Sequence, residues 1–245
     1  MRRFLHILSV TLITAGLVIF IDVGMTLLWK EPISTVYGSI QQNQAKGQLK
    51  DLEKSFPQSP DLKRISRIGN IDDRVRALAD LFQQQVVGNT GKGIGRIEIP
   101  RMDLDIVVVQ GTDTASLQKG PGHYTRSDNP ATVEAGDGSA FPGQGKTVGI
   151  AGHRTTYLAP FRRLDELKKG DEITLQMPYA NFTYKLQKTK IVTPDKIQIV
   201  HNAGYDRLVL TACNPLYSAS QRIAAFAKLE KVSLFGSGER IWQDP

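Results

Sequence analysis

The chain has 245 residues, with 31 Lys and Arg against 24 Asp and Glu for a formal net charge of +7, and 40% of its side chains are hydrophobic. This length allows one domain of ordinary size with an appendage, and the apolar fraction is sufficient for a hydrophobic core. The basic residues form no polybasic block, so we expect no nucleic-acid partner. The single cysteine, Cys213, excludes an intramolecular disulfide, and four scattered histidines exclude the common structural zinc sites.

The beginning of the chain is apolar. Over residues 4–29 the only strongly polar side chains are His6 and Asp22, while Arg2 and Arg3 come just before. A helix of about 20 residues crosses the hydrocarbon core of a bilayer. The positive-inside rule then predicts a single-pass membrane protein with a cytoplasmic N-terminus and the rest of the chain outside the cell. A cleaved signal peptide is the alternative, but the apolar stretch is longer than a usual signal core and ends without a small-x-small cleavage site.

Residues 31–90 resemble an extracellular stalk. Their first half is rich in Gln and charged side chains, and Pro57 and Pro60 interrupt any long helix. After Asn70, which can act as a helix N-cap, apolar residues recur at helical spacing as far as Gly88. The pattern predicts an amphipathic helix of about 16 residues. This helix packs on the following domain or, as the alternative, binds a partner.

From residue 93 onward, the pattern changes to short runs of β-forming residues separated by Gly, Pro, Asn and Asp. The predicted strands are 94–99, 104–109, 147–151, 172–177, 181–192, 207–212 and 223–232. Short connections make the first and second strands, and the fourth and fifth, antiparallel neighbours. Short helical segments fit at 114–118 and 160–168, and the Gly-rich residues 125–145 form a surface loop or a site wall. An all-β domain of this kind is a closed barrel or a sandwich, because closure removes exposed sheet edges.

Cys213 falls at the end of a predicted strand, directly before Asn214 and Pro215. A structural cysteine lies more often in the middle of a strand, as a small buried apolar residue. A strand end puts the sulfur at the rim of the domain, where a substrate can reach it. Outside the cell, an unpaired cysteine is an intermolecular disulfide, a liability or a nucleophile. Cys213 is therefore a candidate reactive thiol.

A cysteine nucleophile needs a proton acceptor and a group that stabilises negative charge on a carbonyl oxygen. His153 lies at another predicted strand end, where Gly149 and Gly152 let the backbone approach a second element closely. Arg222 opens the strand after the cysteine loop, and its guanidinium can hold a substrate carbonyl or an oxyanion. His123 lies in a loop that could line the same site. Position alone leaves a structural role open for each of these residues.

At these residues, the chain resembles the sortases, membrane-anchored cysteine transpeptidases of Gram-positive bacteria, and most closely their class E branch. The similarity covers about residues 93–232 and includes Lys119-Gly-Pro-Gly-His-Tyr124, Ile150-Ala-Gly-His-Arg-Thr-Thr-Tyr157 and Leu210-Thr-Ala-Cys213 followed by Arg222. The resemblance implies a closed eight-stranded sortase-type β-barrel with short helices, preceded by a single N-terminal transmembrane helix. This architecture agrees with the seven or eight strands that the sequence pattern predicts.

The resemblance also assigns roles to residues. The catalytic histidine, cysteine and arginine of the family fall on His153, Cys213 and Arg222. Further candidates for substrate binding are Thr211, Ala212, His123 and Tyr157. The family signature Thr-Leu-x-Thr-Cys is not fully kept, because Ala212 stands where relatives have a Thr whose hydroxyl helps to line the substrate groove.

The reaction implied by the resemblance begins with attack of Cys213 on the Thr carbonyl of a C-terminal Leu-x-x-Thr-Gly-like sorting motif in a secreted protein. A thioacyl enzyme forms, and an amine of a lipid-linked peptidoglycan precursor resolves it. Protein anchoring is favoured over pilin assembly. We expect no metal or organic cofactor, because Glu134 and Asp137 are the only close acidic pair in the long loop.

We thus expect four parts. Residues 1–30 form a cytoplasmic tip and membrane anchor, 31–90 a stalk with an amphipathic helix, 91–235 the catalytic barrel and 236–245 a tail. Two alternatives stay open. One is another cell-wall cysteine enzyme, such as an L,D-transpeptidase or a peptidase, although the Ser-x-Gly-Cys pattern of L,D-transpeptidases is missing around Cys213. The other is a non-enzymatic wall-binding β-domain.

Overall fold

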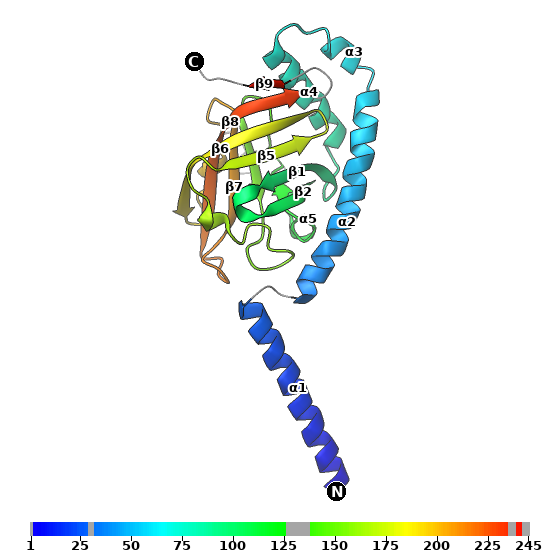
Figure 1. The fold of residues 1–245 in the computed structure, drawn as a ribbon, viewed down its shortest axis with the longest axis vertical. Coiled ribbons are helices and arrows are strands. Elements are labelled where there is room, and N and C mark those ends of the chain that lie inside the picture. Colours follow the sequence, from blue (N-terminus) through cyan, green and yellow to red (C-terminus); the bar gives the residue numbers. More distant parts are fainter. Residues whose placement is uncertain (1, 29–31, 126–137, 235–238, 242–245) are drawn as a thin grey trace.

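The protein is described by a computed structural model that covers residues 2–28, 32–125, 138–234 and 239–241 (Figure 1). A β-barrel forms its centre, one long helix projects from the barrel, and a second long helix lies along the side of the barrel. The helices are α1 (Arg2–Leu28), α2 (Pro32–Ser55), α3 (Leu62–Ile65), α4 (Ile71–Val86) and α5 (Thr114–Leu117). The strands are β1 (Gly93–Ile99), β2 (Leu104–Gln110), β3 (Gly122–His123), β4 (Thr147–Ala151), β5 (Glu172–Met177), β6 (Ala180–Val192), β7 (Arg207–Asn214), β8 (Gln221–Leu234) and β9 (Glu239–Ile241).

The strands close into a ring. Their order is β6, β5, β1, β2, β3, β4, β7, β8, and the long antiparallel pairing of β6 with β8 joins the two ends. The closed eight-stranded barrel predicted from the sequence is thereby confirmed. Strand β9 pairs with β8 beyond the ring and lies in the segment expected to be a tail. All seven predicted strands are present; the ring also needs the two-residue β3, which bridges β2 and β4.

The barrel core follows from the alternation of side chains along these strands. In β6, for example, Phe182, Tyr184 and Leu186 are buried, while the residues between them are more exposed. Of the two predicted helical segments, 114–118 forms α5, whereas 160–168 contains only the short 3₁₀ helix Leu164–Glu166 and turns. In the predicted loop 125–145, residues 126–137 lie outside the described part of the chain, together with the Glu134 and Asp137 pair.

Helix α4 is the amphipathic helix predicted after Asn70. The Asn70 side chain accepts hydrogen bonds from the backbone N–H groups of Asp72 and Asp73, which satisfies two free donors of the first turn. The apolar face of the helix belongs to the barrel core, and fully buried Phe82 contacts Phe141 edge to face at 5.3 Å between ring centroids. Helix α4 thus packs on the barrel.

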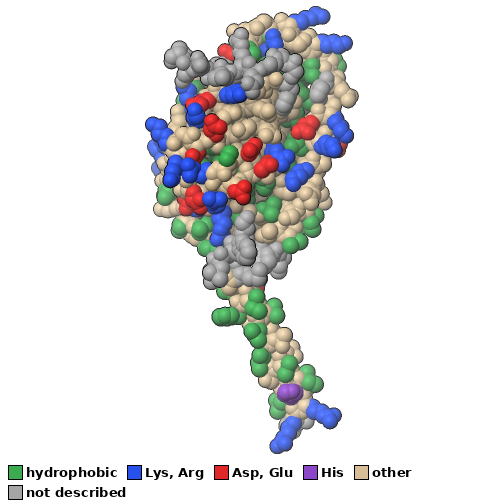
Figure 2. Space-filling model, in the orientation of Figure 1, with side chains coloured by type: hydrophobic (Ala, Val, Ile, Leu, Met, Phe, Trp, Pro, Cys, Tyr) green, Lys and Arg blue, Asp and Glu red, His purple; other side chains and the backbone are tan. Residues whose placement is uncertain are grey.

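Helix α1 projects away from the barrel. Its stretch Arg2–Gly24 has a mean hydropathy of 2.4, and none of it is buried against the rest of the protein. At about 1.5 Å per residue, α1 is about 40 Å long, enough to cross a bilayer. Large apolar side chains of this helix are exposed from Phe4 to Val23, whereas the barrel face in Figure 2 carries mixed acidic and basic side chains. By length and composition, α1 is compatible with a membrane anchor.

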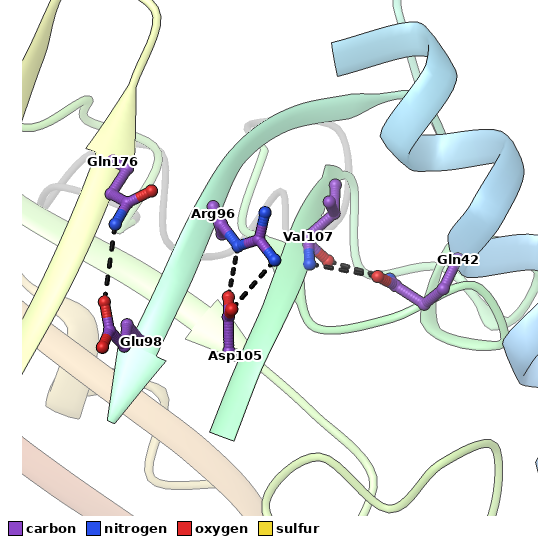
Figure 3. Close-up of polar contacts among 6 residues, drawn as sticks. All are labelled: Gln42, Arg96, Glu98, Asp105, Val107 and Gln176. Atoms are coloured by element: carbon purple, nitrogen blue, oxygen red, sulfur yellow. Dashed lines mark hydrogen bonds and ion pairs between the residues drawn. The ribbon is translucent and has the colours of Figure 1, made fainter. Parts of the chain in front are cut away.

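Helix α2 occupies the first half of the segment expected to be a stalk, and it lies against the barrel. Its buried Gln42 side chain accepts from the Val107 N–H at 3.0 Å and donates to the Val107 C=O at 2.9 Å (Figure 3). Strand β3 pairs only with Val109 and Gln110 of β2, so the Gln42 amide takes the place of a neighbouring strand beside Val107. Ala45 and Leu49 of the same helix are buried against Val107 and Val109. Hydrophobic periodicity could not predict the Gln42 contact, because glutamine is polar.

Candidate active site

Three strands bring the predicted catalytic residues to one end of the barrel, which we call the barrel edge. Strands β4 and β7 run parallel, with Ala151 beside Thr211, and both end at this edge. The Gly152 N–H donates to the Thr211 C=O at 2.9 Å and extends the pairing by a further step. Two residues beyond the Ala151–Thr211 pair, the chain reaches His153 on one side and Cys213 on the other.

Strand β8 supplies the third residue. It starts at the same edge and runs antiparallel to β7, so that Arg222 lies directly opposite Cys213. Side chains directly opposite in an antiparallel pair have Cβ atoms about 5 Å apart and share one face of the sheet. The predicted strand-end position of Cys213 is confirmed, because β7 ends one residue later.

The alternation along β7 decides which way Cys213 faces. Leu210 and Ala212 belong to the main core, so Cys213 lies on the opposite, outer face. The same argument applies after β4, because an added Cβ at Gly152 would lie 2.6 Å from the Cδ2 atom of buried Phe161. Gly152 therefore faces the core, and its neighbour His153 faces outward. The close approach predicted for this glycine is confirmed.

His153 is half-buried, and its surroundings favour the neutral imidazole. Burial removes water from the ring and lowers the pKa of His153 below its ordinary value near 6.5. Its Nε2 atom is buried and has no hydrogen-bond partner among the described residues. The Tyr157 ring lies 5.4 Å away between centroids. An unpaired nitrogen in this place can exchange a proton with a bound substrate.

Arg222 is held by the loop between β7 and β8. Its Nη1 donates to the carbonyl oxygens of Ala219 and Gln221, both at 2.9 Å. A guanidinium has five N–H donors, so several are left for a carbonyl or carboxylate ligand. Cys213, which is the free thiol of the chain, is partly exposed beside it.

The loop after His153 has an unusual backbone. Tyr157, Leu158 and Ala159 have φ angles of 47°, 69° and 45°, a region that side-chain-bearing residues seldom enter. The Tyr157 N–H donates to Ser34 Oγ at 3.2 Å, and the Tyr157 ring contacts Tyr37 edge to face. Ser34 and Tyr37 open helix α2, so the loop beside His153 rests on the start of this helix.

The other predicted substrate residues differ in their placement. Thr211 shares the outer face with Cys213 but is buried, and its hydroxyl bonds to the Tyr124 hydroxyl at 2.9 Å. Ala212 is buried in the core beneath the site. His123 is 2% exposed, and its ring nitrogens bond to Gln110 Oε1 and the Ala140 C=O. The structure therefore does not bring the His123 ring to the rim of the groove.

Sequence reasoning missed two side chains close to the site. Arg154 and Asn214 directly follow His153 and Cys213, and Arg154 is only 3% exposed. Their hydrogen bond joins the ends of β4 and β7. Nothing in the spacing pointed to it, because an arginine in a polar loop is ordinarily a solvated charge.

Comparison with known proteins gives the family. The family model described as Sortase domain matches residues 97–230, more than half of the chain. The chain is 37% identical over 127 residues to Sortase D of Bacillus subtilis, which covers 51% of this chain and 57% of that protein. It is 27% identical over 151 residues to Sortase SrtE1 of Streptomyces coelicolor, covering 57% of this chain and 41% of that protein. The matches thus span about half the length of these curated relatives.

Solved structures agree on the fold. The crystal structure of Sortase E1 from Streptomyces coelicolor with a tripeptide in the active site superposes with a TM-score of 0.54 at 22% identity, over 61% of this chain and 95% of that one. Sortase E from Streptomyces avermitilis gives a TM-score of 0.50 at 30% identity, over 62% of this chain and 96% of that one. By its domain match, its barrel and these relatives, the chain belongs to the sortase family and is similar to the class E branch.

Proposed function

We propose that this protein is a cysteine transpeptidase in which Cys213 is the nucleophile, His153 the proton carrier and Arg222 the oxyanion and substrate ligand. The observation that carries the proposal is the meeting of the three residues at one barrel edge, with Cys213 opposite Arg222 across β7 and β8. Membership of the sortase family supports it.

In the first half of the reaction, the Cys213 proton lies on His153, and the resulting thiolate attacks a peptide carbonyl carbon. A C–S bond forms and the C–N bond breaks, while His153 gives a proton to the leaving amine. Arg222 donates hydrogen bonds to the carbonyl oxygen as negative charge develops on it. In the second half, an incoming amine attacks the thioester, His153 takes the amine proton, and Cys213 is released as a thiolate beside the imidazolium, ready for the next cycle.

The proposed substrates follow the family. The acyl donor is a secreted protein with a C-terminal Leu-x-x-Thr-Gly-like sorting motif, and the acceptor is an amine of a lipid-linked peptidoglycan precursor. Helix α1 is proposed as a single-pass anchor with a cytoplasmic N-terminus and the barrel outside the cell. The four parts of the chain, 1–30, 31–90, 91–235 and 236–245, are proposed as anchor, barrel-bound connector, catalytic domain and tail.

The test uses the full chain in detergent micelles with a Leu-x-x-Thr-Gly peptide library and a glycine-based amine acceptor. We expect a thioester on Cys213, detected by mass spectrometry, and a peptide–amine product. Cys213→Ala should abolish both, and Arg222→Ala should slow acylation at least tenfold, because one lost oxyanion donor costs about 10²-fold or more in rate.

Other outcomes favour the alternatives. Thioester formation without amine transfer would make the protein a peptidase. Reaction with wall peptides but not with the library would favour another wall enzyme. Wall binding that persists unchanged in Cys213→Ala, without any thioester in the parent protein, would favour a binding domain.

A further inference from the structure

The three proposed catalytic residues each have a polar neighbour in the chain, and these neighbours contact one another. Arg154 follows His153, Asn214 follows Cys213, and Gln221 precedes Arg222. Successive side chains of an extended strand point to opposite sides. Asn214 and Gln221 therefore lie on the opposite face of β7 and β8 from Cys213 and Arg222, and Arg154, beyond the end of β4, contacts Asn214.

Hydrogen bonds join these neighbours into a row of three side chains. Arg154 Nη1 donates to Asn214 Oδ1 at 2.9 Å, and Asn214 Nδ2 donates to Gln221 Oε1 at 3.0 Å. The orientation of the Asn214 amide is fixed, because a guanidinium only donates and so must face the amide oxygen. Asn214 and Gln221 form the cross-strand pair next to the Cys213–Arg222 pair.

At the Arg154 end of this hydrogen-bonded row of side chains, Arg154 also binds the loop after His153. Arg154 Nε and Nη2 donate to the Arg162 C=O at 3.3 and 3.0 Å, and Nη2 lies 2.7 Å from Asp165 Oδ1. The side chain of Arg154 is 2% exposed, whereas that of Asp165 is 54% exposed. Burying a guanidinium costs a high desolvation penalty, which its hydrogen-bond and ion-pair partners offset. Removing one of these partners destabilises the folded protein. The planar fork of a guanidinium can hold three partners in fixed directions at once.

We infer that Arg154 is a positioning residue that sets the distance and angle between His153 and the Cys213–Arg222 pair. β-Sheet hydrogen bonds already fix Cys213 against Arg222. His153 lies beyond the end of β4, so the Arg154–Asn214 bond is the side-chain link that ties its loop to β7. This inference rests on the proposed function, because it concerns the geometry of that active site.

The first test compares Arg154→Met with the parent protein, as the full chain in detergent. Methionine fills much of the same volume without any donor. We expect kcat for peptide–amine transfer to fall by about 10²-fold, as for a misplacement of about 1 Å, with KM changed less than threefold. Arg154→Lys should not restore the rate, because an ammonium cannot reproduce the fork. Arg163→Met, at an exposed arginine of the same loop that pairs with Glu166, is the matched control and should behave like the parent protein.

The second test measures alkylation of Cys213 by iodoacetamide as a function of pH, which needs no peptide substrate. His153→Ala gives the profile of a thiol uncoupled from the imidazole. We expect the Arg154→Met profile to shift from that of the parent protein toward that of His153→Ala. Should the parent protein alkylate with a His153-dependent profile but accept no sorting peptide, the proposed function fails while the positioning role is still measured.

The inference is overturned if Arg154→Met keeps the parent kcat, KM and alkylation profile. Where Arg154→Met does not fold, as judged by circular dichroism, Asn214→Ala decides, because it removes the link between the loop and β7, together with the exposed bond to Gln221, and leaves Arg154 its contacts with Arg162 and Asp165. Asn214→Ala should lower kcat and shift the alkylation profile in the same direction. Parent-like values for Asn214→Ala would also overturn the inference.

Discussion

His153 is a titratable residue whose ring is partly shielded from water. Its ring is half-buried beside Tyr157, and loss of water lowers its pKa. Cysteine and histidine side chains ordinarily have pKa values near 8.5 and 6.5, so a small fraction of such pairs carries a thiolate beside an imidazolium at neutral pH. In the proposed mechanism, the surroundings of His153 therefore affect how much of the protein is in the reactive form.

Replacing Tyr157 with Ala should return water to the ring and raise the pKa of His153 toward 6.5. The acid limb of the bell-shaped kcat/KM profile should move to higher pH with it. NMR titration of the His153 ring and the kinetic profile measure the two effects. Tyr205→Ala, at a tyrosine that contacts Lys228 instead, is the control. A profile flat from about pH 5 to about pH 10 would contradict the proposed roles of both His153 and Cys213.

The elements of this fold differ in how well the sequence predicts them. The strands that carry the site were predictable because β-branched and apolar runs end at Gly, Pro, Asn or Asp, and the positions of Cys213 and Arg222 followed from them. Strand β3 has only two residues, too few for any periodicity. Helix α2 contacts the barrel through buried Gln42, Ala45 and Leu49, but most of its other residues are Gln or charged, so composition suggested a stalk. The burial of His123 depends on Gln110 and Ala140, which only the fold brings together.

Helix α2 offers an element-scale prediction at Gln42. Gln42→Ala should lower the free energy of unfolding by about 2 kcal/mol, because it leaves the buried Val107 N–H and C=O unpaired. Gln42→Glu should be worse at neutral pH, since its carboxylate would face the carbonyl oxygens of Val107 and Lys119. Denaturant unfolding measures both. Gln44→Ala, at an exposed glutamine of the same helix, is the control. Equal stability of the Gln42→Ala and Gln44→Ala variants would contradict the proposed contribution of the Gln42–Val107 hydrogen bonds.

At the scale of the whole molecule, a partly buried carboxylate makes stability depend on pH. Asp206 accepts from the Gly143 N–H at 3.1 Å and the Gly145 N–H at 3.2 Å. Burial nevertheless raises the pKa of Asp206 to about 6. A folded-state pKa above the unfolded one means that this group stabilises the fold below about pH 4, and that the contribution is lost as pH rises through about 6.

We therefore expect the stability advantage of the parent protein over Asp206→Asn to shrink as pH rises. The loss between pH 4 and pH 7 should be about 2 kcal/mol. Denaturant unfolding of both proteins at several pH values measures it, and the difference between them removes the contributions of other carboxylates. A difference that stays constant or grows over this range would show that Asp206 ionises more readily in the fold than in the unfolded chain.

With α1 as the proposed membrane anchor, the hydrogen bond between Tyr157 and Ser34 limits how far the proposed active site can lie from the membrane. Ser34 is ten positions along the chain from Gly24, the end of the apolar stretch of α1. Even a fully extended connection of that length reaches only about 35 Å. With α1 in a bilayer, the loop beside His153 stays within this height of the lipid surface. Encounters with lipid-linked or membrane-held substrates would then be a lateral search in two dimensions, governed by their surface density rather than by their concentration in solution.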